Sequence, residues 1–181
     1  MQITHWLGSP TATNPLTISA TQRVIQVLLG AFVLGLVISG LTAFPLVAEV
    51  TILEQLFGTG SWAGNLWPAL GWWISFVFQG LTETNAKYPF MLYGTDWLAF
   101  AHVVIAIAFI GPLRDPVRNI WVVEFGMIAC FLLVPLALIC GPLRGIPPFW
   151  IAIDCSFGMF GIIPLVIAYR HIKRLIALQP H

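Results

Sequence analysis

Apolar residues fall into four long runs along this chain, separated by short polar or proline-containing segments. The runs cover about residues 23–45, 95–112, 117–140 and 150–170. A helix of roughly 20 apolar residues is long enough to cross a bilayer core about 30 Å thick. Helix starts and stops lie between the runs, at Asp115-Pro116, Gly141-Pro142 and Pro147-Pro148. The pattern predicts an all-α, polytopic membrane protein built on a four-helix transmembrane bundle.

The segment at residues 66–82 is apolar enough to be a fifth span or a helix that does not cross the bilayer. Half of the eight tryptophans lie in or beside it, at positions 62, 67, 72 and 73. Tryptophan is enriched at the membrane–water interface. Apolar residues also recur here at helical spacing, from Trp67 to Leu81. We expect an interfacial or re-entrant helix in an outer loop of residues 46–94.

Composition supports a membrane protein and excludes a nucleic-acid-binding one. Hydrophobic residues make up 59% of the 181 residues and charged residues 8%, with a mean hydropathy of +0.91. Soluble domains carry about 25% charged residues. The net charge of +1 provides no basic field for nucleic acid. The lipid bilayer is therefore the expected partner.

Lysine and arginine predict the orientation, because cytoplasmic loops are enriched in both. In the four-span arrangement six of the eight cations share one side, and only Lys87 and Arg144 lie on the other. A fifth span would leave three cations inside. We expect a bacterial inner-membrane protein with both termini cytoplasmic: an N-terminal segment at 1–22, a membrane domain at 23–174 and a tail at 175–181. The six cations are Arg23, Arg114, Arg118, Arg170, Lys173 and Arg174.

His102 and Glu124 are the candidate catalytic residues, as a proton-handling pair. At 1.5 Å per residue they lie roughly 13 and 12 Å from the same membrane edge, on consecutive spans. If both face the seam between these spans, they could exchange a proton, bind an amine or contribute to a metal site. The alternative is a hydrogen bond that only holds two helices together.

Asp96 and Asp154 are the candidate ligand-binding residues, at a second level near the outer interface. Ionisable side chains within spans are expensive and mark functional sites by default. Asp96 follows Gly94-Thr95, so an N-terminal cap of its helix is the alternative role. Pro135 and Pro164, inside the last two spans, are expected to kink them and to favour a pocket bounded by the four titratable residues.

Motifs for other chemistries are absent from the sequence. The three cysteines are scattered without CxxC spacing, and neither HExxH, GxSxG nor a phosphate-binding glycine loop occurs. Only His102 among four histidines lies within a span, so a bis-histidine haem has no support. We therefore predict no metal site and assign no cofactor.

The order of the spans resembles the EXPERA domain of emopamil-binding proteins and their relatives. The resemblance rests on Asp96, His102, Glu124 and the segment GIIPLVIAYRHIKR at 161–174. Those domains are four-span bundles with a long first outer loop and a proline-bearing last span that ends in basic residues. The resemblance implies a sterol-like ligand or a double-bond isomerase. It contains no motif from which catalytic residues can be transferred.

Two functions follow, and the sequence leaves both open. The first is an intramembrane polar site that binds or transforms a small lipophilic molecule. The second is a non-catalytic subunit or assembly factor, which would meet a membrane-protein partner or a second copy through its aromatic helix and small-residue faces. A small transporter ranks third, because four spans lack a clear inverted repeat. The sequence does not decide whether the protein is an enzyme.

Overall fold

The computed structural model describes residues 15–178, which form helices and short connections without a strand. The all-α prediction is confirmed. In chain order the elements are α1 (Pro15–Ala43), α2 (Leu46–Phe57), α3 (Trp62–Leu66), α4 (Pro68–Lys87), the 3₁₀ helix η1 (Pro89–Leu92), α5 (Tyr93–Ala108), α6 (Ile110–Arg114), α7 (Ile120–Leu143) and α8 (Pro148–Leu178).

Four helical segments of the described chain are long and apolar enough to span a membrane: Ile18–Ala43, Pro89–Arg114, Ile120–Leu143 and Pro148–Leu178. The polytopic four-helix class is therefore confirmed. The second segment continues through Phe109 into α6, because Pro112 falls in the first turn of α6, where its missing N–H costs little.

The terminal helices extend past the predicted spans. α1 begins at Pro15 rather than near residue 23, and α8 continues to Leu178 rather than ending near 170. Helical hydrogen bonding does not stop at the membrane edge, so the basic ends of these spans stay helical. The predicted terminal segments 1–22 and 175–181 thus lie partly in α1 and α8. Their remainders, residues 1–14 and 179–181, lie outside the described residues.

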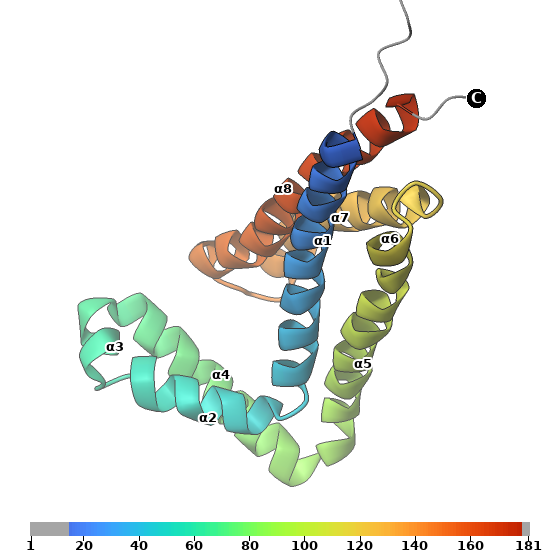
Figure 1. Cartoon of the computed structure of the whole chain (residues 1–181). Helices are drawn as coiled ribbons and strands as arrows, with labels where there is room; N and C mark the ends of the chain where they lie inside the picture. Colours follow the sequence, from blue (N-terminus) through green and yellow to red (C-terminus); the bar gives the residue numbers. More distant parts are fainter. Residues whose placement is uncertain (1–14, 179–181) are drawn as a thin grey trace, which may run out of the picture.

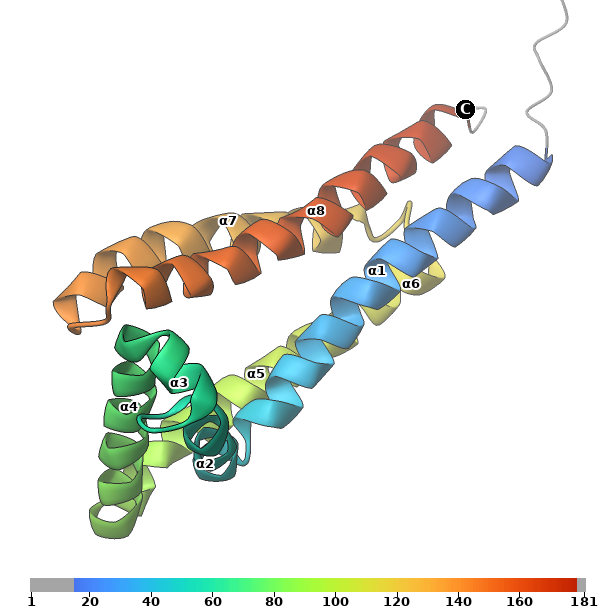
Figure 2. The same cartoon turned by 90° about the vertical axis from the view of Figure 1, so that its left-hand side faces the viewer.

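The four spans run up and down in chain order. α1 packs against α5 and α8, and α7 packs against α8 along its length. The start of α1, the end of α8 and the link at 115–119 lie at one end of the molecule, and α2–α4 and the α7–α8 turn lie at the other (Figures 1 and 2). We call these the terminal end and the hairpin end.

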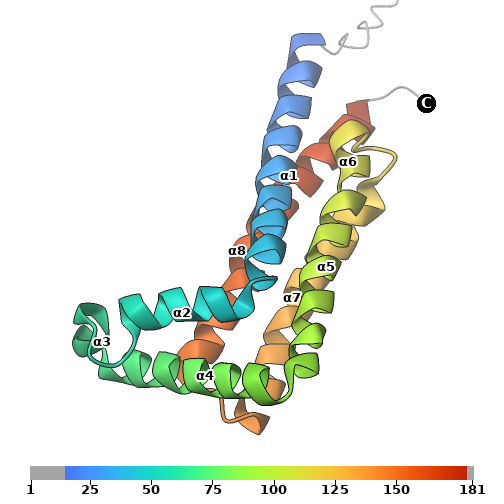
Figure 3. The ribbon, with the colours of Figure 1, turned by 90° about the horizontal axis from the view of Figure 1, so that it is seen from below.

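α2 and α4 form an antiparallel hairpin across the hairpin end, at a steep angle to the spans (Figure 3). α4 contains most of the ambiguous segment 66–82 and is not among the helices apolar enough to span. The prediction that this segment is a helix outside the four spans is confirmed, and its place at an outer interface stays a prediction. The Ser75 hydroxyl donates to the Glu54 carboxylate at 2.9 Å and accepts from the Thr59 N–H at 2.9 Å, which fastens α4 to α2.

The core lies near the terminal end. Phe109 is fully buried there, and its ring centroid lies 4.9 Å from that of Phe32 on α1. Toward the hairpin end the α1–α5 and α7–α8 pairs diverge (Figure 2). The buried residues of the core are Ile25, Leu29, Phe109, Val122, Val123, Leu165, Ala168, Ile172 and Leu175.

α4 bridges the two diverging pairs at the hairpin end. Near its start, Trp67 and Trp73 contact Phe149 and Trp150 of α8, with ring centroids 5.0 and 6.3 Å apart. Its other end leads through η1 into α5. The stretch from Trp73 to Lys87 spans roughly 20 Å of helix. α4 therefore acts as a spacer between α8 and α5.

Glycines determine where two spans approach closely. A Cβ added at Gly158 would lie 2.5 Å from the Cys130 carbonyl oxygen of α7, and one at Gly40 would lie 2.9 Å from the Ala99 carbonyl oxygen of α5. Gly30 and Gly35 have nothing within 4 Å of an added Cβ. Gly40 and Gly158 therefore lie at contacts between spans of this chain, whereas Gly30 and Gly35 do not.

Candidate functional site

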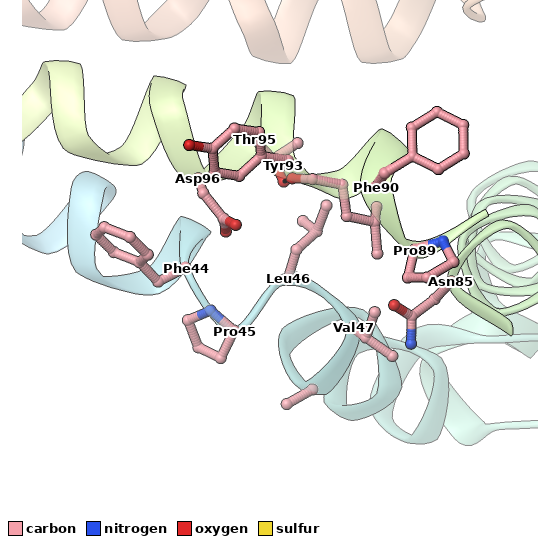
Figure 4. Close-up of a pocket in the computed structure, with 12 residues that line it drawn as sticks. Phe44, Pro45, Leu46, Val47, Asn85, Pro89, Phe90, Tyr93, Thr95 and Asp96 are labelled. Carbon is pink, nitrogen blue, oxygen red and sulfur yellow. Dashed lines mark hydrogen bonds between the residues drawn. The ribbon is translucent and has the colours of Figure 1, made fainter.

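A cavity of about 530 Å³ lies at the hairpin end, between the α1–α2 turn, the end of α4, η1 and the first turn of α5 (Figure 4). Its lining is mostly apolar and aromatic, with few polar side chains. The lining residues are Phe44, Pro45, Leu46, Val47, Ala48, Asn85, Pro89, Phe90, Leu92, Tyr93, Thr95 and Asp96.

Two residue–proline steps produce the turns that surround the cavity. A residue before proline is disfavoured in the helical region, so the chain leaves the helix there. α1 ends at Ala43 just before Phe44-Pro45, and α4 ends at Lys87 just before Tyr88-Pro89. Tyr88 accordingly has φ −138° and ψ 63°. The two turns set α2 and α4 aside from the spans and leave space between them.

Asp96 presents the one carboxylate of the cavity lining. It lies in the first turn of α5, is half-buried, and points into the cavity (Figure 4). Its neighbour Thr95 is already bonded, since its hydroxyl donates to the Leu92 carbonyl at 2.6 Å. Asp96 has no hydrogen bond or ion pair with any residue from 15 to 178 and does not cap α5. The capping alternative is therefore wrong, and the carboxylate faces open space.

His102 faces α1. Its Nδ1–H donates to the Leu98 carbonyl of its own helix at 2.8 Å. A Cβ placed on Gly40 of α1 would lie 3.1 Å from the His102 Cβ. The imidazole is therefore held within α5, beside α1 rather than α7.

Glu124 lies beside α8. The Tyr169 hydroxyl is near enough to its carboxylate for the two groups to interact. Tyr169 was missed in the sequence, although it stands in the apolar last span four residues before Lys173 and could have been found as the polar aromatic at the depth of Glu124.

The expected direct bond between His102 and Glu124 is not formed in the described structure. Consecutive spans were expected to pack as a hairpin. Instead α5 packs on α1 and α7 on α8, because Gly40 and Gly158 allow those pairs to approach. A proton-handling role for the two residues stays a prediction.

Asp154 is half-buried on α8, six residues after the helix begins. Its carboxylate has no hydrogen bond or ion pair with residues 15–178. It does not line the cavity that contains Asp96. Of the four titratable residues expected around one pocket, this cavity is lined by Asp96 and not by His102, Glu124 or Asp154.

The described part of the chain contains no group of three His, Cys, Asp or Glu placed to bind a metal ion. Its three cysteines are free thiols. The arrangement therefore offers a cavity with a single carboxylate at the hairpin end and a neighbouring tyrosine and glutamate deeper in the spans.

The fold and this cavity define a polytopic, α-helical membrane protein with a cavity at the hairpin end. Comparison of the chain with protein-family models, with curated proteins and with solved structures gave no match. Its function is therefore argued from its own geometry.

Proposed function

We propose that this protein binds a small lipophilic molecule in the cavity at the hairpin end. The observation that carries the proposal is the cavity of about 530 Å³ between α2, α4 and α5, lined by apolar and aromatic side chains around one carboxylate. Small-molecule sites typically have about 300–1,000 Å³, an apolar lining and a few polar groups that orient the ligand.

The position of the cavity favours an amphiphile. It lies where the apolar spans that contain α1 and α5 meet the α2–α4 hairpin, so a bilayer edge at this end would bring both hydrocarbon and headgroups to it. Phe44 and Phe90 are 47% and 74% exposed, which leaves an apolar path from the cavity to the bilayer. A ligand with an apolar body and one polar group fits this boundary better than a fully polar metabolite.

Filling the cavity should abolish binding. Ala48→Trp adds an indole at the lining, and we expect it to lower the retention of a lipophilic ligand at least about tenfold, since overpacking displaces the ligand's own contacts. Ala69→Trp is the matched control, because Ala69 is an exposed residue of α4 outside the cavity lining. Native mass spectrometry of the detergent-extracted protein measures the amount and mass of co-purified ligand.

A ligand that is retained by the wild type and by Ala69→Trp, and lost from Ala48→Trp, would support the site. Equal retention by all three proteins would place the ligand elsewhere. A wild type that retains no small molecule, even after incubation with lipid extract, would contradict the proposal.

Chemistry on the ligand stays a hypothesis. The neighbouring Glu124 and Tyr169 fit a role in holding α7 to α8, and His102 lies on the span that contributes Asp96. A sterol-like ligand, as the resemblance to the EXPERA domain implies, matches the apolar lining. A catalysed isomerisation would further require a proton donor and acceptor at the bound molecule.

A subunit or assembly role is the second candidate. Gly30 and Gly35 of α1 have no neighbour in the described chain, and small residues let a second helix approach closely. A membrane-protein partner or a second copy could pack there. Co-purification of a stoichiometric partner that is lost when both glycines become leucine would favour this function over ligand binding.

We also propose a bacterial inner membrane with the terminal end in the cytoplasm, supported by the six cations at that end. In a variant without native cysteines, an impermeant maleimide should label Asn65→Cys in intact cells and Arg118→Cys only after permeabilisation. Both positions are exposed. The reverse pattern would invert the topology.

A further inference from the structure

We propose that the cavity accepts an ammonium group, so that its ligand is a cationic amphiphile bound by Asp96. This rests on the proposed function and names the chemical class of its ligand. Among the twelve lining residues Asp96 is the one charged side chain. Its carboxylate points inward and has no hydrogen bond or ion pair within the described chain.

An unpaired carboxylate at an apolar boundary favours a cationic ligand over a neutral or anionic one. When a ligand closes the cavity, Asp96 loses water, and a buried charge is costly unless it is paired. A neutral ligand leaves that cost in place, and a carboxylate or phosphate adds repulsion. An ammonium group provides the missing partner through a charge-assisted contact.

The protein itself does not provide that partner. Lys87 is the nearest cation along the chain, but its Nζ lies over the Tyr88 ring, 5.3 Å from the ring centroid. Lys87 does not line the cavity. Because neither it nor any other described cation pairs with Asp96, the carboxylate is left for a ligand.

The surrounding layer is acidic and aromatic. Between residues 44 and 96 the chain has four acidic residues and one basic residue. This charge raises the local concentration of cations at the cavity. The rings of Phe44, Phe90 and Tyr93 also line it, and ring faces attract ammonium groups.

The test compares probes with the same twelve-carbon chain and different headgroups. Purified protein in an uncharged detergent is assayed by scintillation proximity with tritiated dodecyltrimethylammonium and, separately, tritiated dodecanol. Unlabelled dodecylamine and dodecanoate serve as competitors. We expect both ammonium probes to bind about 10- to 100-fold more tightly than dodecanol, the factor for a hydrogen bond or ionic contact with a charged group. Dodecanoate should not compete.

Asp96→Asn should remove this preference, so that the Kd of dodecyltrimethylammonium lies within about threefold of the Kd of dodecanol. Asp96→Glu should keep most of the preference. Glu83→Gln is the matched control, since Glu83 carries a charge in the same layer, bonds to Gln79 and does not line the cavity. Thermal unfolding of each variant verifies that it is folded.

Two results overturn the inference and leave the proposed function standing. One is equal binding of ammonium and alcohol probes, unchanged in Asp96→Asn but lost in Ala48→Trp. The other is an equal loss of the preference for ammonium probes in Glu83→Gln and Asp96→Asn. That result would assign the preference to the overall negative charge of the layer rather than to Asp96. Retention of no probe, or retention unaffected by Ala48→Trp, contradicts the proposed function itself.

Discussion

Replacing Gly158 with alanine should separate α7 from α8 and destabilise the protein. The added Cβ would lie 2.5 Å from the Cys130 carbonyl oxygen, a backbone atom that cannot rotate away. One helix must therefore shift along the seam on which the α7–α8 pair depends. We expect a loss of about 1–3 kcal/mol, as for other overpacked sites. Thermal unfolding of the purified protein, followed by circular dichroism, measures it.

The matched control is Gly30→Ala. An added Cβ there has nothing within 4 Å, and alanine is the better helix former by up to about 1 kcal/mol. The same chemical change should thus be neutral or stabilising in α1 and destabilising in α8. Equal melting temperatures for both variants would contradict the close approach of α8 to α7.

Phe109→Ala should produce the second large effect. Phe109 is fully buried where α5 meets α6, and its ring lies against Phe32. A Cβ on Gly126 of α7 would lie 2.7 Å from the Phe109 Cζ, so the ring fills the space that this glycine leaves. Truncation removes packing against α1 and α7 within the buried cluster that also contains Leu165 of α8.

We expect Phe109→Ala to cost about 3 kcal/mol, the lower end of the range for truncated aromatic residues. The lower end applies because the spans of a membrane protein remain in lipid when they separate. The lost stability therefore comes from packing and not from exposure of the side chain to water. Phe131→Ala is the control, since that ring is 67% exposed on α7. Chemical denaturation in mixed micelles measures both. Similar losses would contradict a core at Phe109.

The helical class could be predicted from the sequence because the bilayer fixes the length of an apolar run. That α4 is not a fifth span could be predicted too, because its tryptophans and the distribution of cations along the chain made a fifth span unfavourable. Neither argument determines which spans pack together. The pairing depends on where a glycine, which has no Cβ, faces a backbone carbonyl of the neighbouring helix, as at Gly40 and Gly158.

The candidate site was predictable only in part. A charged residue in an apolar run draws attention wherever it lies, so Asp96, His102, Glu124 and Asp154 were all singled out. Their neighbours were not predictable, because the direction of each side chain depends on the packing of its helix. The cavity around Asp96 depends on turns at Pro45 and Pro89, which are far apart in sequence.

The spacer role of α4 has a consequence for the surrounding lipid. With the spans joined near Phe109 and held apart by α4, the protein is wedge-shaped. In a bilayer, this shape would displace more lipid from the leaflet at the hairpin end than from the leaflet at the terminal end. The free energy of separating or closing the two pairs would then depend on membrane curvature and on the lateral pressure in that leaflet.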